Sequence, residues 1–510
     1  MRKLLAIPVA TVLVVGLGAS PAAAIDEVNS KKLRDAVTVN GILGHERVFQ
    51  RIANQNGGTR ASGTPGYAAS ANYVKSTLAK AGYDVSEQEF TFPFFRELAP
   101  ATLAQTAPTA QTYTTGTFNY SGTGDVTGTV VAVDIQIPPA PTPSSTSGCE
   151  ASDFTPASAT EPQIALIQRG SCDFRVKAEN AQAAGYDAVI IFNEGQPGRT
   201  ELFIGDLGRP FTIPVVGLSF EDASALYAQV QGPGDVTVRV TTSTETDLAA
   251  KTTNVFAETP GGDADKVIVV GAHLDSVVEG PGINDNGSGS AAILEIAKQM
   301  AKLDIKPRQK VRFAFWGAEE SGLLGSEYYV DNLPADELAS IYANLNFDML
   351  GSPNYVRFVY DGDGSDTPVE GPAGSAEIED IFTKYFASQG LASEPTEFSG
   401  RSDYGPFIAV GIPAGGLFSG AEGVKTPEQA AVYGGTAGEQ YDPCYHEACD
   451  DINNLSTKAL HELGDAAAHA VFTLARTKTG FFPDGSLRAR AAKQAYVAPE
   501  FDYKGSHAIR

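Results

Sequence analysis

Residues 266–275, which read KVIVVGAHLD, decide how the rest of this chain is interpreted. The stretch from Lys266 to Ala272 is an almost unbroken apolar run, as a strand that is buried on both faces requires. The run ends on two polar residues, His273 and Asp275. The segment therefore predicts a buried strand with functional side chains at its carboxyl end.

Two further buried strands follow this one along the chain. They are predicted at Lys310–Trp316, just before Glu319 and Glu320, and at Tyr342–Met349, which contains Asp348. Helical periodicity separates and follows them, over Ser290–Leu303, Ala376–Gln389 and Ser456–Arg476. Strands that alternate with helices predict an α/β fold with a mainly parallel central sheet and helices on both faces.

Polar residues gather at the predicted strand ends. Ligands in an open α/β sheet lie beyond the carboxyl ends of its strands, so these residues are expected to converge in one crevice. The set contains His273, Asp285, Glu319, Glu320 and Asp348, with His446 arriving from a late loop. Two histidines with several carboxylates suit zinc, and one carboxylate can bridge two ions. Of the adjacent pair, one glutamate can bind metal while the other serves as a general base.

Composition narrows the class of partner. The chain has 510 residues and a formal net charge of -24. This balance disfavours binding to nucleic acid or to anionic membrane surfaces, because a protein binds either of them through clustered Lys and Arg. A length above 500 residues also predicts two domains, or one large domain with an insertion.

The first 24 residues resemble a secretory signal peptide. Arg2 and Lys3 precede an apolar run from Leu4 to Leu17, and small residues follow up to Ala24. The apolar run is too short to span a membrane comfortably. We therefore expect secretion after cleavage near Ala24.

Four cysteines occur, at positions 149, 172, 444 and 449. An even number in an exported chain indicates two disulfides, and proximity along the chain pairs Cys149 with Cys172 and Cys444 with Cys449. The alternative, thiolate metal ligands, is disfavoured because neither pair has the short spacing of a zinc-thiolate site.

The first half of the chain has a different pattern. Two helices are predicted between Asn29 and Leu78, followed by a strand over Tyr83–Phe92. Short β-rich runs then recur between Val126 and Val240, with one helix at Arg175–Ala184. This pattern predicts a small β-rich domain set inside a larger one.

Seven stretches carry a resemblance to a known family. They are GAHLDS (271–276), GINDNGSGSAA (282–292), FAFWGAEESGLLGS (313–326), LNFDMLGSPN (345–354), GRSDYGPF (400–407), GGLFSGAEG (415–423) and CYHEACD (444–450). In this order and spacing they resemble the secreted co-catalytic di-zinc aminopeptidases of the Streptomyces type. The resemblance covers about residues 30–92 and 250–476.

The resemblance implies a complete metal site with two Zn²⁺ per chain. Asp285 would bridge both ions. His273 and Asp348 would complete the coordination of one ion, and Glu320 and His446 that of the other. It also implies a cis peptide bond after Asp285.

The resemblance further implies roles around the metals. Glu319 would be the general base, Asp275 would orient the imidazole of His273, and Tyr445 would hydrogen-bond the developing oxyanion. Arg401 would help to position the substrate, and Phe418 would line the pocket for its first side chain.

A second resemblance falls in the β-rich region. Residues 164–194, IALIQRGSCDFRVKAENAQAAGYDAVIIFNE, are similar to a protease-associated domain, which is noncatalytic in its relatives. The expected division is a signal peptide (1–24), a catalytic domain in two segments (25–97 and 248–480), the inserted domain (98–247) and a tail (481–510). The inserted domain would limit substrate size, or alternatively serve only folding or stability.

A calcium site is not expected to be complete. Some relatives bind Ca²⁺ through acidic residues on the helix after the CYH motif; Asp465 matches one of them, but His461 stands where another acid would be.

The expected function is hydrolysis of large apolar N-terminal residues, such as leucine, from peptides by a monomeric enzyme. One alternative is a carboxypeptidase or dipeptidase on the same scaffold, for which Arg401 is the only candidate cation. The other is a metal-free binding protein of the same fold, which the complete set of ligands disfavours.

Overall fold

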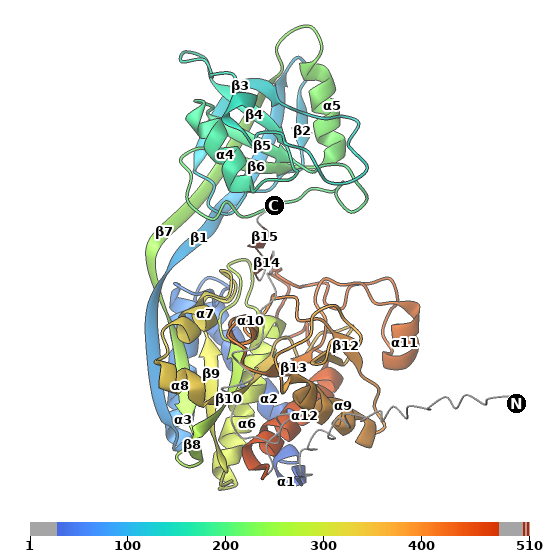
Figure 1. The fold of residues 1–510 in the computed structure, drawn as a ribbon. Coiled ribbons are helices and arrows are strands. Elements are labelled where there is room, and N and C mark those ends of the chain that lie inside the picture. Colours follow the sequence, from blue (N-terminus) through green and yellow to red (C-terminus); the bar gives the residue numbers. More distant parts are fainter. Residues whose placement is uncertain (1–27, 479–502, 505–506, 509–510) are drawn as a thin grey trace, which may run out of the picture.

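The computed structural model describes residues 28–478, 503–504 and 507–508. The predicted signal peptide (1–24) and nearly all of the tail (481–510) therefore lie outside the described residues. None of the helices in the described ranges has both the length and the apolar character to cross a membrane. The molecule consists of an α/β body and an insert, which is made of the elements from β2 to α5 and stands beyond one end of the body (Figure 1).

The α/β body contains a mainly parallel sheet, as predicted. Its strand order is β12-β11-β13-β10-β8-β9-β7. β8 lies between β9 and β10 and runs parallel to both, and β13 is parallel to β10. The bounds are β7 Thr237–Glu258, β8 Asp263–His273, β9 Gln309–Trp316, β10 Ile341–Phe347, β11 Phe358–Tyr360, β12 Glu394–Thr396 and β13 Ala414–Phe418.

Helices cover both faces of this sheet. Alternate residues of β8 explain why: Ile268 and Val270 pack with the helices on one face, while Val267 and Val269 pack with Tyr329 of α7 on the other. The first face carries α1 Lys31–Arg34, α2 Val39–Gln55, α3 Pro65–Ala81, α6 Gly289–Lys302, α9 Ser375–Ser388 and α12 Thr457–Arg476. The remaining helices of the body are α7 Leu324–Asp331, α8 Ala335–Ser340, α10 Gly405–Ala409 and α11 Pro427–Tyr433.

The carboxyl ends of the central strands point toward the insert. β7 enters the body from the insert and runs antiparallel to β9, with Val255 opposite Phe315 and Glu258 opposite Arg312. β9 therefore runs back toward the insert. β8, which is parallel to β9, and β10, which is parallel to β8, do the same. The edge predicted to carry the functional residues thus faces the insert.

The insert has its own cores, and its strands continue the sheet of the body beyond β7. Its strands are β2 Gln111–Tyr113, β3 Gly124–Val133, β4 Gln163–Gln168, β5 Ala188–Phe192 and β6 Val215–Leu218. The predicted helix is present as α4 Phe174–Ala183, and a short 3₁₀ turn, η1, spans Ala151–Asp153. A second helix, α5 Phe220–Val230, was not predicted; Ser219 caps it by accepting from the backbone N–H of Asp222. A disulfide joins Cys149 to Cys172, as expected.

Two long antiparallel strands join the insert to the body. β1 spans Asp84–Ala107, far beyond the predicted strand Tyr83–Phe92, and it pairs with β7 along most of its length. Figure 1 shows this ribbon running along one side of the body and up into the insert. Register shifts interrupt it, including one between Phe92 and Phe94, around Pro93. The two shortest strands, β14 Tyr503–Lys504 and β15 His507–Ala508, pair with each other.

Candidate metal centre

The predicted residues come from five segments at the carboxyl edge of the sheet. His273 is the last residue of β8, and Asp285 lies in the distorted turn η2, Ile283–Ser288, before α6. Glu319 and Glu320 follow β9, and Asp348 follows β10. His446 belongs to a loop closed by the second expected disulfide, Cys444–Cys449. The structure brings all these side chains together.

The Asp285 carboxylate lies between the two imidazoles. Its Oδ1 is 3.2 Å from His273 Nε2, and its Oδ2 is 3.2 Å from His446 Nε2. On the first side, Asp348 Oδ1 is 3.3 Å from His273 Nε2; on the second, Glu320 Oε2 is 3.2 Å from His446 Nε2. The atoms therefore form two groups that share one carboxylate. The peptide bond between Asp285 and Asn286 is cis, as predicted.

These separations fit zinc. Zinc bonds of about 2.0–2.1 Å in a tetrahedron place neighbouring ligand atoms about 3.3 Å apart. The four nitrogen–oxygen distances, 3.2–3.3 Å, match this value. In addition, the buried Asp348 Oδ1 accepts no hydrogen bond from the described part of the chain. Imidazole and carboxylate donors in this arrangement are suited to two ions.

The site holds several carboxylates away from water. Burial raises the pKa of Glu319 well above its ordinary value; the His273 charge opposes this, and Glu320 raises it further. Burial also acts to raise the pKa of Asp285, but hydrogen bonds and charge from His273 and His446 outweigh it and lower that pKa. Both imidazoles have pKa values well above the usual range because their carboxylate neighbours outweigh burial. The protein alone thus concentrates negative charge that a divalent cation would neutralise.

Asp275 lies behind His273, on the side away from the shared carboxylate. The Nδ1 atom of His273 is 3.3 Å from the backbone oxygen of Asp275 and 3.6 Å from its Oδ1. The same Oδ1 accepts from the backbone N–H of Glu319 at 3.3 Å. Asp275 therefore contacts both a predicted ligand and the segment of the predicted base.

A pocket of about 280 Å³ opens over these groups. Tyr445, Arg401 and Phe418 all line it. The Tyr445 ring stacks on His446 with 3.8 Å between centroids, and Arg401 Nη2 donates to the Tyr445 hydroxyl at 3.4 Å. The described lining also includes residues that the sequence did not single out: Met349, Tyr360, Thr396, Glu397, Ser399, Ser402, Tyr404 and Ala421.

Comparisons with known proteins identify the scaffold. The model of peptidase family M28 matches residues 254–471, and the PA domain model matches residues 126–226. An aminopeptidase of Pseudomonas aeruginosa is 50% identical over 431 residues, 82% of this chain and 78% of that protein. The chain belongs to peptidase family M28. The expected family and the inserted PA domain are thereby confirmed.

Two further relatives of this M28 chain bear on its chemistry. Leucine aminopeptidase 2 of Trichophyton equinum is 45% identical over 363 residues, 71% of this chain and 72% of that protein. The structure of BSAP, a zinc aminopeptidase from Bacillus subtilis, is 25% identical with a TM-score of 0.60, and the match covers 86% of this chain and 95% of that one. The α/β fold predicted from the strand pattern is that of these peptidases.

Sequence reasoning missed the residues that hold the M28 site from behind. Ser402 Oγ donates to Asp348 Oδ2 at 2.5 Å and accepts from Asn346 Nδ2 at 2.7 Å. Asp450 and Asp442 hydrogen-bond to the segment that carries Asp285. Ser402 and Asp450 stand inside the quoted motifs GRSDYGPF and CYHEACD. Nothing in the sequence, however, indicates which distant segment their side chains contact.

Two other acidic groups do not resemble the metal centre. At the position expected to be an incomplete calcium site, Asp465 Oδ2 is 3.2 Å from Arg34 Nη1, so an arginine already faces this carboxylate. A second group consists of Asp361, Asp363 and Glu379, and Asp361 there accepts from the backbone N–H groups of Asp366 and Thr367.

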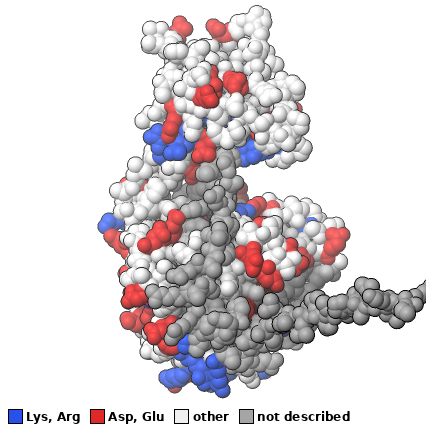
Figure 2. Space-filling model, in the orientation of Figure 1, with Lys and Arg blue, Asp and Glu red and all other residues white. Residues whose placement is uncertain are grey.

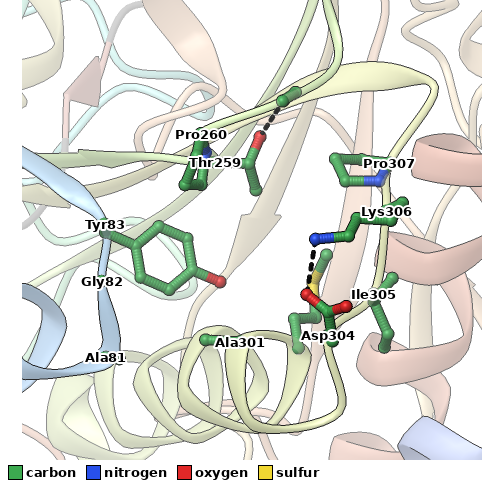
Figure 3. Close-up of a pocket in the computed structure, with 12 residues that line it drawn as sticks. Ala81, Gly82, Tyr83, Thr259, Pro260, Ala301, Asp304, Ile305, Lys306 and Pro307 are labelled. Carbon is green, nitrogen blue, oxygen red and sulfur yellow. Dashed lines mark hydrogen bonds and ion pairs between the residues drawn. The ribbon is translucent and has the colours of Figure 1, made fainter.

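A second cavity of about 400 Å³ lies at the opposite end of the sheet, between the end of α3 and the end of α6 (Figure 3). Tyr83, Met300 and Ile305 give it an apolar wall, and Lys306 pairs with Asp304 at its rim. Its lining within the described residues contains no histidine or cysteine. Among the described lining residues, this cavity therefore lacks the imidazole and thiolate donors that zinc sites commonly use.

Proposed function

We propose that this M28 peptidase is a secreted aminopeptidase that uses two zinc ions and prefers large apolar N-terminal residues. The observation that carries the proposal is the position of Asp285, whose two oxygens each face a different histidine at 3.2 Å. A single carboxylate shared by two matched donor groups is the arrangement of a two-metal hydrolase. Aminopeptidases among the relatives and a zinc aminopeptidase among the structures support the same choice.

The ligand assignment follows from the two groups. Asp285 would bridge the ions, with His273 and Asp348 on one side and His446 and Glu320 on the other. When bound, the two ions supply the Lewis acidity that amide hydrolysis requires near neutral pH. Asp275, behind His273, would fix the orientation of that imidazole.

Glu319 is the proposed general base. It is buried, and its Oε2 is 3.8 Å from His273 Nε2, so it borders the first group without taking part in the four close contacts. Its carboxylate would take a proton from the attacking water and pass it to the leaving amine. A raised pKa suits this exchange because it brings the group closer to the working pH.

Tyr445 is the proposed oxyanion donor. Its hydroxyl lies at the pocket beside His446 and is held by Arg401. A phenol fixed in this way can donate a hydrogen bond to the oxygen on which negative charge develops. The stacking of its ring on His446 keeps the hydroxyl close to the metal centre.

The charges in the pocket favour a substrate amine over a carboxylate. Apart from the two histidines, Arg401 is the one basic residue in the described lining, and its Nη1 is 2.5 Å from Glu422 Oε1. Its charge is thus largely matched by Glu422. Carboxylates such as Glu319 and Glu397 dominate the rest and would attract a free α-ammonium group.

The apolar preference rests on the walls of the pocket. Phe418 and Met349 line it, and Phe418 stacks on Phe358 with 5.9 Å between ring centroids. A branched or aromatic side chain would bury apolar surface against these residues. The leucine aminopeptidase among the relatives supports this preference.

Export and access are also part of the proposal. Residues 1–24 would be the signal peptide, and the two disulfides in the described chain fit an oxidising compartment. The PA domain, toward which the strand ends point, would limit the size of the peptides that reach the site. We propose residues 25–97 and 248–480 as the catalytic domain and a monomer as the working unit.

Turnover of blocked and free substrates tests the proposal. We expect hydrolysis of leucine-p-nitroanilide, much slower hydrolysis of the glycine analogue, and none of N-acetyl-leucine-p-nitroanilide. Metal analysis of the same sample should find two zinc ions per chain. Activity confined to N-blocked peptides with a free carboxylate would instead support a carboxypeptidase, and an active protein with one ion would contradict the two-metal assignment.

A further inference from the structure

The disulfide loop that carries Tyr445 and His446 is bracketed by two buried carboxylates. Asp442 comes two residues before Cys444, and Asp450 directly follows Cys449. Their exposed fractions are 0% and 2%. A buried carboxylate is costly unless it is hydrogen-bonded, so its partners show what it holds in place.

Asp450 binds the main chain of the segment that contains Asp285. Its Oδ1 accepts from the backbone N–H of Asn284 at 2.8 Å, and its Oδ2 accepts from that of Asp285 at 2.9 Å. Its backbone oxygen accepts from Ile283 N at 3.0 Å. Three consecutive N–H groups therefore end on this one residue, which fixes both the position and the direction of the segment.

Asp442 holds the same segment through the side chain of Asn284. Its Oδ2 accepts from Asn284 Nδ2 at 2.6 Å, and its Oδ1 accepts from Cys444 N at 2.9 Å. Asn454 Nδ2 joins the two carboxylates, at 2.8 Å from Asp442 Oδ1 and 3.2 Å from Asp450 Oδ1. The loop and the segment are thus connected at both ends of the loop.

We propose that Asp450, assisted by Asp442, is a positioning residue that sets the Asp285 carboxylate at the right distance from His446. The inference rests on the proposed two-metal function, because Asp285 and His446 would bind the same ion. Neither aspartate reaches a substrate or a metal position through its described contacts. Each acts on the ion through the residue that it holds.

The substitution Asp450→Asn tests the idea with little change in size. An amide presents one acceptor and one N–H₂ group, so it must turn a donor toward one of the two backbone N–H groups. The segment should shift away from the loop and separate Asp285 from His446. Partners that orient metal ligands typically alter metal affinity about 10–100-fold.

The insert offers a matched control. Glu194 is also buried, and its Oε1 accepts from two consecutive backbone N–H groups, those of Ser144 and Ser145, at 2.7 and 2.8 Å. Its Oε2 accepts from Arg199 Nη1 at 3.1 Å, so in Glu194→Gln the N–H₂ group must face either the two backbone donors or this arginine, and the variant damages a buried carboxylate contact in the insert. A loss that appears only in Asp450→Asn cannot come from a general weakening of the fold.

The experiment is a zinc titration of the full chain after chelation, in competition with a chromophoric chelator. We expect two ions in the wild type and in Glu194→Gln. In Asp450→Asn, one of the two should bind at least about 10-fold more weakly while the other changes less. Asp442→Asn, which leaves intact the hydrogen bonds that the backbone N–H groups of Asn284 and Asp285 donate to Asp450, should show a smaller loss at the same ion.

The outcomes separate the two proposals. A wild type that binds only one ion would overturn the two-metal function and this inference with it. Two ions in the wild type and unchanged affinity in Asp450→Asn would overturn the positioning role alone, as would an equal loss in Glu194→Gln. If Asp450→Asn does not fold, unchanged binding by Asp442→Asn overturns the role.

Discussion

Arg401 and Glu422 form an ion pair at the mouth of the substrate pocket, with Nη1 and Oε1 2.5 Å apart. The same guanidinium donates through Nη2 to the hydroxyl of Tyr445. Glu422 therefore both reduces the positive charge that an incoming α-ammonium group meets and holds the arginine against the tyrosine. The pair is partly exposed, so its effect should be modest.

Removal of that acid should weaken substrate binding. In Glu422→Gln, we expect KM for leucine-p-nitroanilide to rise about 2- to 5-fold, in line with the weak energy of exposed ion pairs. Product inhibition by free leucine should strengthen because Arg401 becomes available to a carboxylate. Steady-state kinetics measure both. Glu245→Gln, which breaks the exposed pair with Arg96 in the ribbon, is the control and should change neither constant.

Loss of the proposed base should separate metal binding from turnover. We expect Glu319→Gln to lower kcat by at least about 100-fold, the usual contribution of a general base. Zinc content, measured on the same preparation, should stay at two ions, because Asp285, His273 and His446 are intact. Near-normal kcat in this variant would rule out Glu319 as the base, and Glu428→Gln on the exposed helix α11 controls for the change of charge.

Removal of metal should destabilise the fold as well as abolish activity. Without cations, the carboxylates of Asp285, Glu320 and Asp348 repel one another at the sheet edge. A ligand that binds the folded state at a thousand times its Kd contributes about 4 kcal/mol, so chelation should lower Tm by several degrees. Calorimetry with and without a chelator measures the shift, and zinc should reverse it. An unchanged Tm would mean that the ions contribute little to folding.

His469 should make stability sensitive to acid. Burial, together with the nearby charge of Arg34, lowers its pKa from 6.5 to about 4. Between these values the unfolded chain binds a proton that the folded chain excludes, so stability is lost as pH falls through this window. The complete loss would be at most about 3 kcal/mol.

The variant His469→Gln isolates this effect. Compared with the wild type, it should lose less stability between pH 7 and pH 4.5 in denaturant unfolding. His461→Gln, at an exposed position on the same helix α12, should follow the wild type. Parallel curves for wild type and His469→Gln would show that this imidazole does not cause the acid sensitivity.

The α/β body could be predicted from the sequence because its central strands are buried on both faces. Val267 to Val270 can be apolar without interruption only when helices cover both sides, and that pattern is local. His273, Glu320 and Asp348 were expected at the site because they follow such strands, whereas the full ligand assignment, with Asp285 and His446, came from the family resemblance. The excess of acidic residues is also visible on the surface. Acidic side chains form several groups on the face in Figure 2, and basic side chains gather mainly at the lower end of the body and along the lower edge of the insert.

The parts that were missed depend on partners far away along the chain. The ribbon of β1 and β7 pairs residues such as Glu97 and Thr244, and its Ala- and Thr-rich stretches have no strong apolar alternation to reveal a strand. Asp450 reads as one more acid after a cysteine. Its significance lies in hydrogen bonds to a turn 165 residues earlier, which no local pattern indicates.

The ribbon also has a topological consequence. Both passages of the chain between body and insert lie side by side, and Phe94, which packs with Phe92 and Ala318 of the body, lies opposite Asp247. The entire insert is therefore equivalent to the tip of one very long hairpin. Everything above that pair could be replaced by a short turn without rerouting any strand of the body, which makes the PA domain a removable module on an otherwise continuous peptidase fold.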